Sequence, residues 1–284
     1  MTLEQTYQKG KKLLYDTNID SPAFDCMCIF EHCFHIDRQK LIINANKTAC
    51  PETCKTFFEL INERASRRPL QYILGSWEFM GNNFKVGEGV LIPREDTETL
   101  VYECLDRIKN IESPAVIDLC SGSGAIAISI AKKRPDATVF AVELSDKAYT
   151  YLCENIELNN CDNVNPINAN IINSRQIMDF FNISQVDAIV SNPPYIPKKD
   201  IESLQEEVKK EPAMALDGGN DGLDFYKIIS KNWIPYLKLG GFLCVEFGIH
   251  QEDDVETVFK QANLSDIKKI KDFNGIYRVL SAVK

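Results

Sequence analysis

The sequence of 284 residues predicts an α/β protein in which a small all-helical domain and a β-hairpin linker precede a domain built on a mainly parallel sheet. Three observations predict this. Residues 1–75 show helical periodicity, broken by Asn, Asp, Ser and Pro. Residues 76–92 alternate aromatic and β-branched side chains around glycines, as a hairpin does. Over residues 93–284 strand and helix patterns alternate, which favours a parallel sheet with helices on both faces.

The candidate strands of the third region are short apolar runs rich in β-branched residues. They span residues 115–119, 138–144, 186–191, 241–247 and 277–283. Ligands of such sheets bind outside the carboxyl ends of the strands. We therefore look for the functional residues in the loops that follow these strands.

Composition and charge limit the classes of function. The chain is 44% apolar and 26% charged, which is typical of a globular protein. Its net charge is −9, and all of this negative excess falls after residue 93. An extensive nucleic-acid-binding surface is therefore disfavoured. A basic cluster at Arg64, Arg67 and Arg68 is most simply a solvated helix face.

The sequence shows no membrane segment and no export signal. No apolar run reaches the roughly 20 residues that cross a bilayer, and the first residues mix charges of both signs. We therefore expect a cytoplasmic protein that has no membrane partner. Its ten cysteines are then expected to be reduced.

One cysteine cluster has residue types that bind zinc. It contains Cys26, Cys28, His32, Cys33 and His35. The usual zinc spacing is absent, and helical periodicity places Cys26 and Cys33 on one apolar stripe. The favoured interpretation is core packing, and no metal is expected.

A glycine-containing turn follows the first strand of the sheet, within the segment 118–127, DLCSGSGAIA. Glycines allow a tight turn and the close approach of a ligand. Glu143 ends the next strand, where a carboxylate can accept hydrogen bonds from both hydroxyls of a ribose. The turn fits the relaxed dinucleotide fingerprint, so a nicotinamide cofactor stays open. Asp118, however, suits a cation such as S-adenosylmethionine better than a pyrophosphate. A turn that binds no ligand is the third possibility.

The strand 186–191 runs into Asn192-Pro193-Pro194-Tyr195. The prolines fix the backbone and have no amide hydrogens, while the asparagine adds a carbonyl oxygen and the tyrosine a flat ring. Such acceptors can bind a planar NH2 group and draw its nitrogen toward tetrahedral geometry. They also stabilise the positive charge that moves from a sulfonium to that nitrogen. The loop therefore predicts methylation of an amide or a base amine, and its structural alternative is a proline-rich turn.

Over most of its length the chain resembles the HemK/PrmC family of protein-glutamine methyltransferases, which modify the GGQ glutamine of class 1 peptide chain release factors. The matching motifs are Arg68-Pro-Leu-Gln-Tyr-Ile73, Glu78-Phe79, Leu91-Ile-Pro-Arg94, Asp96-Thr-Glu98, Asp118-Leu, Ser121-Gly-Ser-Gly124, Asn192-Pro-Pro-Tyr195, Glu211-Pro, Ala215-Leu, Gly218-Gly and Asp221-Gly-Leu223. The Asn-Pro-Pro-Tyr motif alone also occurs in methyltransferases that act on adenine. The motifs before residue 100 and after residue 210 single out this family.

The resemblance implies a Rossmann-like class I S-adenosylmethionine-dependent methyltransferase domain, with a helical domain that helps hold the protein substrate. It implies that Asn192 and the Pro193 carbonyl hold the glutamine amide, with Pro194 beside them, and that Tyr195 packs on it. The implied cofactor contacts are Asp118, Cys120, Ser121, Gly122, Ser123 and Gly124, then Glu143 at the ribose, Asn170 and Ile171 near the adenine, and Asn192. Cys120 and Ser121 stand where the family usually has Gly and Thr.

The implied function is release factor methylation that supports translation termination. The alternatives are methylation of adenine in nucleic acid, a nicotinamide-dependent oxidoreductase and a binding module without catalysis. We expect class 1 release factors as partners, no stable complex with nucleic acid, and a monomer.

Overall fold

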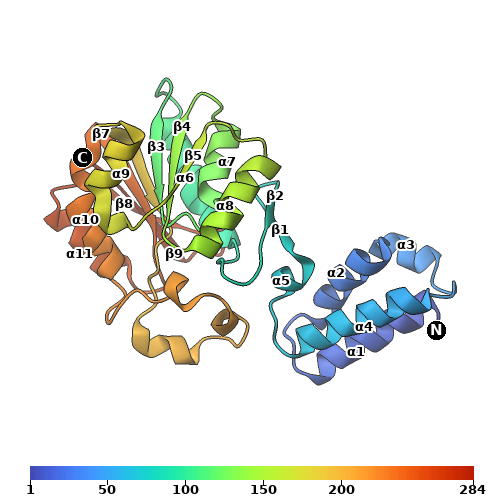
Figure 1. Ribbon diagram of the computed structural model, residues 1–284. Helices are drawn as coiled ribbons and strands as arrows, with labels where there is room; N and C mark the ends of the chain where they lie inside the picture. The colour runs from blue at the N-terminus through green and yellow to red at the C-terminus, as the bar shows by residue number, and fades with distance from the viewer. The chain divides into compact units, whose positions relative to one another are not determined.

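The computed structural model describes residues 1–284, which form two compact units (Figure 1). Unit 1 consists of Met1–Ser76 together with Gln205–Lys210. Unit 2 consists of Trp77–Leu204 together with Glu211–Lys284. A short segment far along the chain thus completes the N-terminal unit. None of the helices combines the length and the apolar character that crossing a membrane requires.

Unit 1 is helical, as the sequence predicts. Its helices are α1 (Leu3–Asp16), α2 (Pro22–Phe34), α3 (Arg38–Ile43), α4 (Pro51–Ala65) and α5 (Leu70–Leu74). Thr2 and Gln5 form a capping box at the start of α1, in which each side chain binds the other's backbone N–H. Proline occupies the first turn of α2 and of α4, where its missing N–H has no helical partner to lose. Local sequence therefore determines where these helices begin.

Aromatic side chains fill the core of unit 1. The rings of Phe30 and Phe57 are fully buried and meet edge to face, with centroids 5.6 Å apart. Gly10 makes room for Phe57, because a β-carbon there would lie 2.6 Å from Phe57 Cζ. Cys26 is buried in the same core, and burial raises the pKa of its thiol to about 12. Cys26 packs as the periodicity predicts, and no group of three or more His, Cys, Asp or Glu side chains is arranged to hold a metal.

A buried ion cluster in unit 1 corrects one sequence prediction. Arg64 is only 7% exposed, so it does not lie on a solvated helix face. Its Nε donates to Asp25 Oδ2 at 2.6 Å, and its Nη2 lies 3.0 Å from Glu207 Oε1. Arg67 Nη1 reaches the same Glu207 oxygen at 3.1 Å. A buried guanidinium needs such partners, because an unpaired charge away from water is costly. Sequence periodicity could not reveal them, since Glu207 lies 143 residues from Arg64.

Unit 2 contains a seven-stranded sheet in the order β5-β4-β3-β6-β7-β9-β8. Its strands are β3 (Ala115–Leu119), β4 (Thr138–Glu143), β5 (Val164–Asn168), β6 (Val186–Ser191), β7 (Leu237–Glu246), β8 (Ser265–Lys271) and β9 (Tyr277–Val283). The first five are parallel, and β9 pairs antiparallel with both β7 and β8. The predicted α/β class is confirmed. The strands β5 and β8, which the sequence did not predict, form the two edges.

Helices cover both faces of this sheet. They are α6 (Glu98–Ile108), α7 (Ala125–Lys133), α8 (Asp146–Leu158), α9 (Ser174–Phe181), α10 (Asp224–Asn232) and α11 (Glu252–Gln261). In Figure 1, α7 and α8 lie on one side of the sheet and α9 to α11 on the other. Strand β3 contributes to a hydrophobic core on each face of the sheet. Val116 packs in the core on the α7 side, and Ile117 packs in the core on the α10 side.

Short helical turns and a hairpin complete unit 2. The hairpin strands are β1 (Ser76–Phe79) and β2 (Asn82–Lys85), and Phe79 and Phe84 pack in the core on the α7 side. The 3-10 turns are η1 (Glu95–Thr97), η2 (Ile171–Asn173), η3 (Lys198–Ser203), η4 (Val208–Lys210, in unit 1), η5 (Ala213–Ala215) and η6 (Ile234–Tyr236).

The sheet order places the two predicted motifs side by side. From β3 the chain builds outward through β4 and β5, and it then returns to add β6 on the other side of β3. The last residues of β3 and β6, Leu119 and Ser191, are register partners, and Ser191 Oγ donates to the Leu119 carbonyl at 2.6 Å. Cys120 and Asn192 therefore leave the sheet next to one another. This is the switch point at which open α/β sheets bind ligands.

Candidate active site

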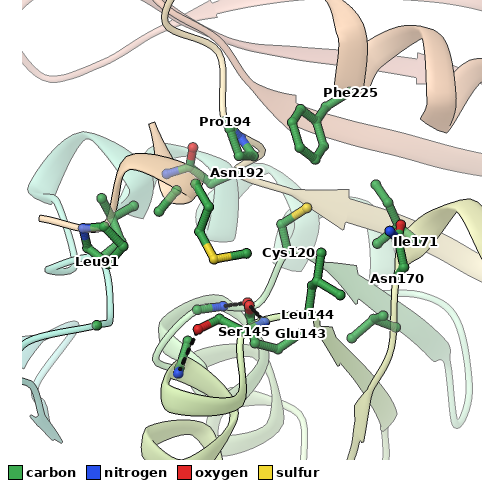
Figure 2. Close-up of a pocket in the computed structure, with 17 residues that line it drawn as sticks. Leu91, Cys120, Glu143, Leu144, Ser145, Asn170, Ile171, Asn192, Pro194 and Phe225 are labelled. Carbon is green, nitrogen blue, oxygen red and sulfur yellow. Dashed lines mark hydrogen bonds between the residues drawn. The ribbon is translucent and has the colours of Figure 1, made fainter. Parts of the chain in front are cut away.

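A pocket opens at the carboxyl ends of β3, β4 and β6 (Figure 2). It holds about 660 Å³, counting the part that is open to solvent. The lining residues are Gly89, Leu91, Cys120, Gly122, Val142, Glu143, Leu144, Ser145, Ala148, Asn170, Ile171, Asn192, Pro194, Pro212, Met214, Ala215 and Phe225. Figure 2 shows Asn192 and Pro194 across the cavity from Glu143, with Asn170 and Ile171 at its side. A mostly apolar wall with a few polar groups is typical of a site for a small organic ligand.

The glycine turn forms one wall of this pocket through a sharp backbone reversal. Cys120, Gly122 and Gly124 all have left-handed backbones, with φ of 62°, 56° and 84°. Glycine adopts this conformation without strain, whereas Cys120 keeps its β-carbon there at a cost of roughly 1–2 kcal/mol. The thiol of Cys120 faces the pocket, where a glycine would leave only backbone.

Glu143 ties the glycine turn to the end of β4. Its Oε2 accepts a hydrogen bond from Gly122 N at 2.8 Å, and its Oε1 accepts one from Ser145 N at 2.7 Å. Burial raises the pKa of this carboxyl, and the backbone N–H groups oppose that effect. The oxygens that line the pocket are thus held in place and can accept hydrogen bonds from ligand hydroxyls.

The Asn-Pro-Pro-Tyr loop is held from several sides. Asn192 Nδ2 donates to Thr97 Oγ1 at 3.1 Å, and the Tyr195 hydroxyl lies 3.4 Å from Glu246 Oε1. Gln251 Nε2 donates to the Tyr195 carbonyl at 2.9 Å. Asn192 and Pro194 face the pocket, whereas the Tyr195 ring is packed beside Gly248. Burial raises the pKa of Tyr195, so its hydroxyl stays protonated and can act as a donor.

The far wall comes from a segment that sequence reasoning did not assign to the site. Pro212, Met214 and Ala215 line the pocket immediately after Glu211, a residue of the late motif. Glu211 is 5% exposed, accepts a hydrogen bond from Ile92 N at 3.0 Å and forms an ion pair with Arg94. The sequence signal for this wall was the pair of family motifs at Leu91–Arg94 and at Glu211. Their residues meet in space.

A smaller pocket adjoins the first. Its additional lining includes Arg94, Thr97, Ser121, Ser123 and Ile126. The two pockets share Leu91, Cys120, Gly122 and Asn192. Asn192 therefore stands where the two spaces meet, and its amide can contact a group in either of them.

Comparison with known proteins places the chain in a family. The family model described as "PrmC N-terminal domain" matches residues 5–75, and the one described as "Methyltransferase small domain" matches residues 96–220. A release factor glutamine methyltransferase of Fusobacterium nucleatum subsp. nucleatum is 39% identical over 280 residues, which is 98% of this chain and 78% of the relative. One from Clostridium botulinum is 36% identical over 286 residues, the full length of both chains. The chain belongs to the release factor glutamine methyltransferase family.

This membership confirms the resemblance and shows that the chain is a methyltransferase. Among solved structures, a methyltransferase from Pyrococcus furiosus is similar with a TM-score of 0.51 and 17% identity, over 72% of this chain and 90% of that one. That likeness shows the fold. Membership also favours S-adenosylmethionine over the nicotinamide cofactor that the glycine turn left open, because the family transfers methyl groups rather than hydride.

The predicted site residues divide into three groups. Cys120, Gly122, Glu143, Asn170, Ile171, Asn192 and Pro194 line the main pocket. Ser121 and Ser123 line only the smaller pocket. Asp118, Gly124, Pro193 and Tyr195 line neither. The structure thus brings together residues at the carboxyl ends of β3, β4 and β6, and the four remaining ones contribute to the lining of neither pocket.

Asp118 is a buried acid behind the glycine turn. It has no solvent exposure, and burial raises the pKa of its carboxyl to about 8. The carboxyl is therefore mostly neutral at pH 7 in the ligand-free protein, and a neutral group exerts little attraction on a sulfonium. The folded protein retains a proton on Asp118 between about pH 4 and pH 8 that the unfolded chain releases. This group therefore lowers the free energy of unfolding as pH rises through that window.

Replacing Asp118 with asparagine is expected to remove this pH dependence. Relative to the parent protein, the free energy of unfolding of Asp118→Asn should rise by roughly 3 kcal/mol between pH 5 and pH 8. Urea unfolding of the ligand-free proteins at both pH values measures the difference. Parallel stability curves for the two proteins would show that Asp118 is already ionised in the folded state at pH 5.

Proposed function

We propose that this chain methylates the side-chain amide nitrogen of the glutamine in the GGQ motif of class 1 peptide chain release factors. The proposal extends to this chain the activity named for its relatives. Asn192 carries it, because this residue lines both the main pocket and the adjoining one. A donor molecule in the first space and an amide in the second would both lie against this side chain.

The residues of the main pocket fit S-adenosylmethionine. Glu143 presents carboxylate oxygens for ribose hydroxyls, and Asn170 with Ile171 offers a polar and an apolar edge for an adenine ring. Leu144 and Phe225 add apolar surface. When bound, S-adenosylmethionine supplies an electrophilic methyl group on a positively charged sulfur.

The chain's own residues hold and polarise the amide. Asn192 Oδ1 and the backbone carbonyl of Pro193 accept hydrogen bonds from the two N–H bonds of the glutamine side chain. Because acceptors on both N–H bonds draw the nitrogen lone pair out of conjugation, they favour attack, and they stabilise the positive charge that develops on nitrogen. No general base is needed before the bond forms, since the proton becomes acidic only then. Tyr195 holds this loop in place through the contact of its ring with Gly248 and the hydrogen bond from its hydroxyl to Glu246.

Methyl transfer to purified release factor tests the proposal. The protein is incubated with methyl-labelled S-adenosylmethionine and either an unmethylated class 1 release factor or the same factor with its GGQ glutamine replaced by alanine. Label is expected on the first substrate only. Equal label on both would refute the residue assignment, and label on an adenine-containing oligonucleotide but on neither factor would favour the nucleic-acid alternative.

A further inference from the structure

A buried hydrogen-bond chain runs from Asn192 to the interior of unit 2. Asn192 Nδ2 lies 3.1 Å from Thr97 Oγ1, and Thr97 Oγ1 lies 2.6 Å from Glu246 Oε2. Thr97 ends the turn η1 and is 4% exposed, while Glu246 ends β7 and is 1% exposed. Three segments that are remote in sequence therefore meet at the Asn192 side chain, beside the smaller pocket that Thr97 also lines.

The number of hydrogens on this chain determines the orientation of the Asn192 amide. A threonine hydroxyl has one hydrogen and two lone pairs, and an ionised carboxylate can only accept. The Thr97 hydrogen is therefore committed to Glu246, so Thr97 offers only a lone pair to Asn192. Only the NH2 end of the Asn192 amide can bind that lone pair. If the amide were reversed, two oxygens would face each other with no hydrogen between them.

We propose that Thr97 and Glu246 are positioning residues that turn the Asn192 carbonyl oxygen toward the substrate and so make the site select an NH2 group over an acceptor. The inference rests on the proposed function, since that function places the substrate amide against Asn192. It adds that discrimination between glutamine and glutamate depends on the hydrogen bonds that Thr97 and Glu246 make. With the NH2 end of Asn192 occupied, the site presents acceptors alone, which pair with an amide NH2 and repel a carboxylate.

The surroundings of Glu246 make this arrangement sensitive to protonation. The hydroxyls of Thr97 and Tyr195 face its carboxylate, and the Tyr226 hydroxyl donates to its backbone carbonyl at 2.8 Å. Arg278 lies nearby, but its guanidinium also pairs with Asp96 at 3.0 Å and Asp272 at 3.4 Å.

Burial has the largest effect on Glu246 and raises its pKa to about 7. The hydrogen bonds from Thr97 and Tyr195 and the positive charge of Arg278 act in the opposite direction. Protonation adds a second hydrogen to the chain. Glu246 can then donate to Thr97, and Thr97 can donate to Asn192, which lets the amide reverse.

Substitution of Thr97 tests the inference. Thr97→Val keeps the shape and removes the hydroxyl, so kcat on release factor is expected to fall roughly 10- to 100-fold, as for a misaligned catalytic group. The KM for release factor and the Kd for S-adenosylmethionine should change by less than about threefold, because the Thr97 hydroxyl is bonded to Asn192 and Glu246 and to neither ligand in this scheme. Thr97→Ser restores the hydroxyl and should recover most of the turnover. Thr257→Val on α11 is the control, because it makes the same change at an exposed threonine whose hydroxyl donates to the Asp253 carbonyl.

The pH profile separates positioning from a merely structural role. For the parent protein, kcat should fall about tenfold for each pH unit below the pKa of Glu246, which lies near 7. Glu246→Gln cannot gain that proton, so its lower kcat should stay level across the same range.

Nuclear magnetic resonance of the ligand-free protein tests the chain without any substrate. The side-chain NH2 signal of Asn192 should be protected from hydrogen exchange in the parent protein and unprotected in Thr97→Val. Equal protection, or equal kcat in Thr97→Val and the parent protein, would overturn the positioning roles. If the parent protein fails to methylate release factor while the protection difference is present, the proposed function fails and the positioning stands.

Discussion

Replacing Asn192 with alanine is expected to lower turnover on release factor by roughly 100-fold or more, the loss typical of removing one preorganised partner of a transition state. The side chain provides an acceptor that is already oriented by Thr97 before substrate arrives. Its interaction strengthens as positive charge develops on the attacking nitrogen, so the loss falls on kcat rather than on substrate binding.

Steady-state kinetics together with calorimetry of S-adenosylmethionine binding measures this effect. The Kd for S-adenosylmethionine should change by less than about tenfold, because Asn192 is one of many residues around the pocket. Asn165→Ala is the control, since Asn165 lies on the edge strand β5 and lines neither pocket. Unchanged turnover in Asn192→Ala would contradict the proposed role of the side-chain oxygen.

A methyl group added at Gly218 is expected to reduce turnover by roughly 30-fold or more. Gly218 N donates to the Ile196 carbonyl at 2.9 Å, so the glycine lies directly against the Asn-Pro-Pro-Tyr loop. A β-carbon at Gly218 would lie 2.7 Å from Tyr195 Cα and 2.9 Å from the Pro194 carbonyl oxygen. These are backbone atoms, so the loop itself must shift, and a displacement of about 1 Å in a catalytic group can cost 100-fold.

Gly240→Ala distinguishes this displacement from a general loss of stability. Gly240 has a left-handed backbone with φ of 77°, but a β-carbon there meets no atom within 4 Å. Alanine at Gly240 is therefore expected to cost about 1 kcal/mol of stability through strain alone. Thermal unfolding and kcat are measured for both variants. Equal kcat in the two would show that the loop tolerates the added group.

The central strands were predictable because a strand that is buried on both faces consists of a nearly continuous run of apolar residues. Strands β3, β6 and β9 have the predicted bounds, and all six residues of β6 are buried. The edge strands carry a different signature. Pro166, Asn165 and Asn168 interrupt the apolar pattern of β5, and β8 carries three lysines, which protect an exposed edge from pairing with another chain. Both look like loops when sequence alone is read.

The lining of the pocket was predictable where one short segment supplies several of its residues. The glycine turn, Glu143 and Asn192 each follow a strand, and parallel strands bring their carboxyl ends to one edge. The chain through Thr97 and Glu246 was not predictable, because these residues lie 149 positions apart and meet only when η1 packs beside β7. Asp118 shows the opposite case, since its place in the motif gave no sign that its side chain is fully buried and lines neither pocket.

The discontinuous make-up of unit 1 limits how this protein can be cut or recombined. A fragment ending at Ser76 would retain Arg64 and Arg67 but lose Glu207, their shared partner. The buried Arg64 would then keep Asp25 as its carboxylate partner, and Arg67 would keep its hydrogen bonds to the carbonyl oxygens of Thr17 and Asn18. Grafting the N-terminal helices of one family member onto the catalytic part of another therefore calls for transferring residues 205–210 as well.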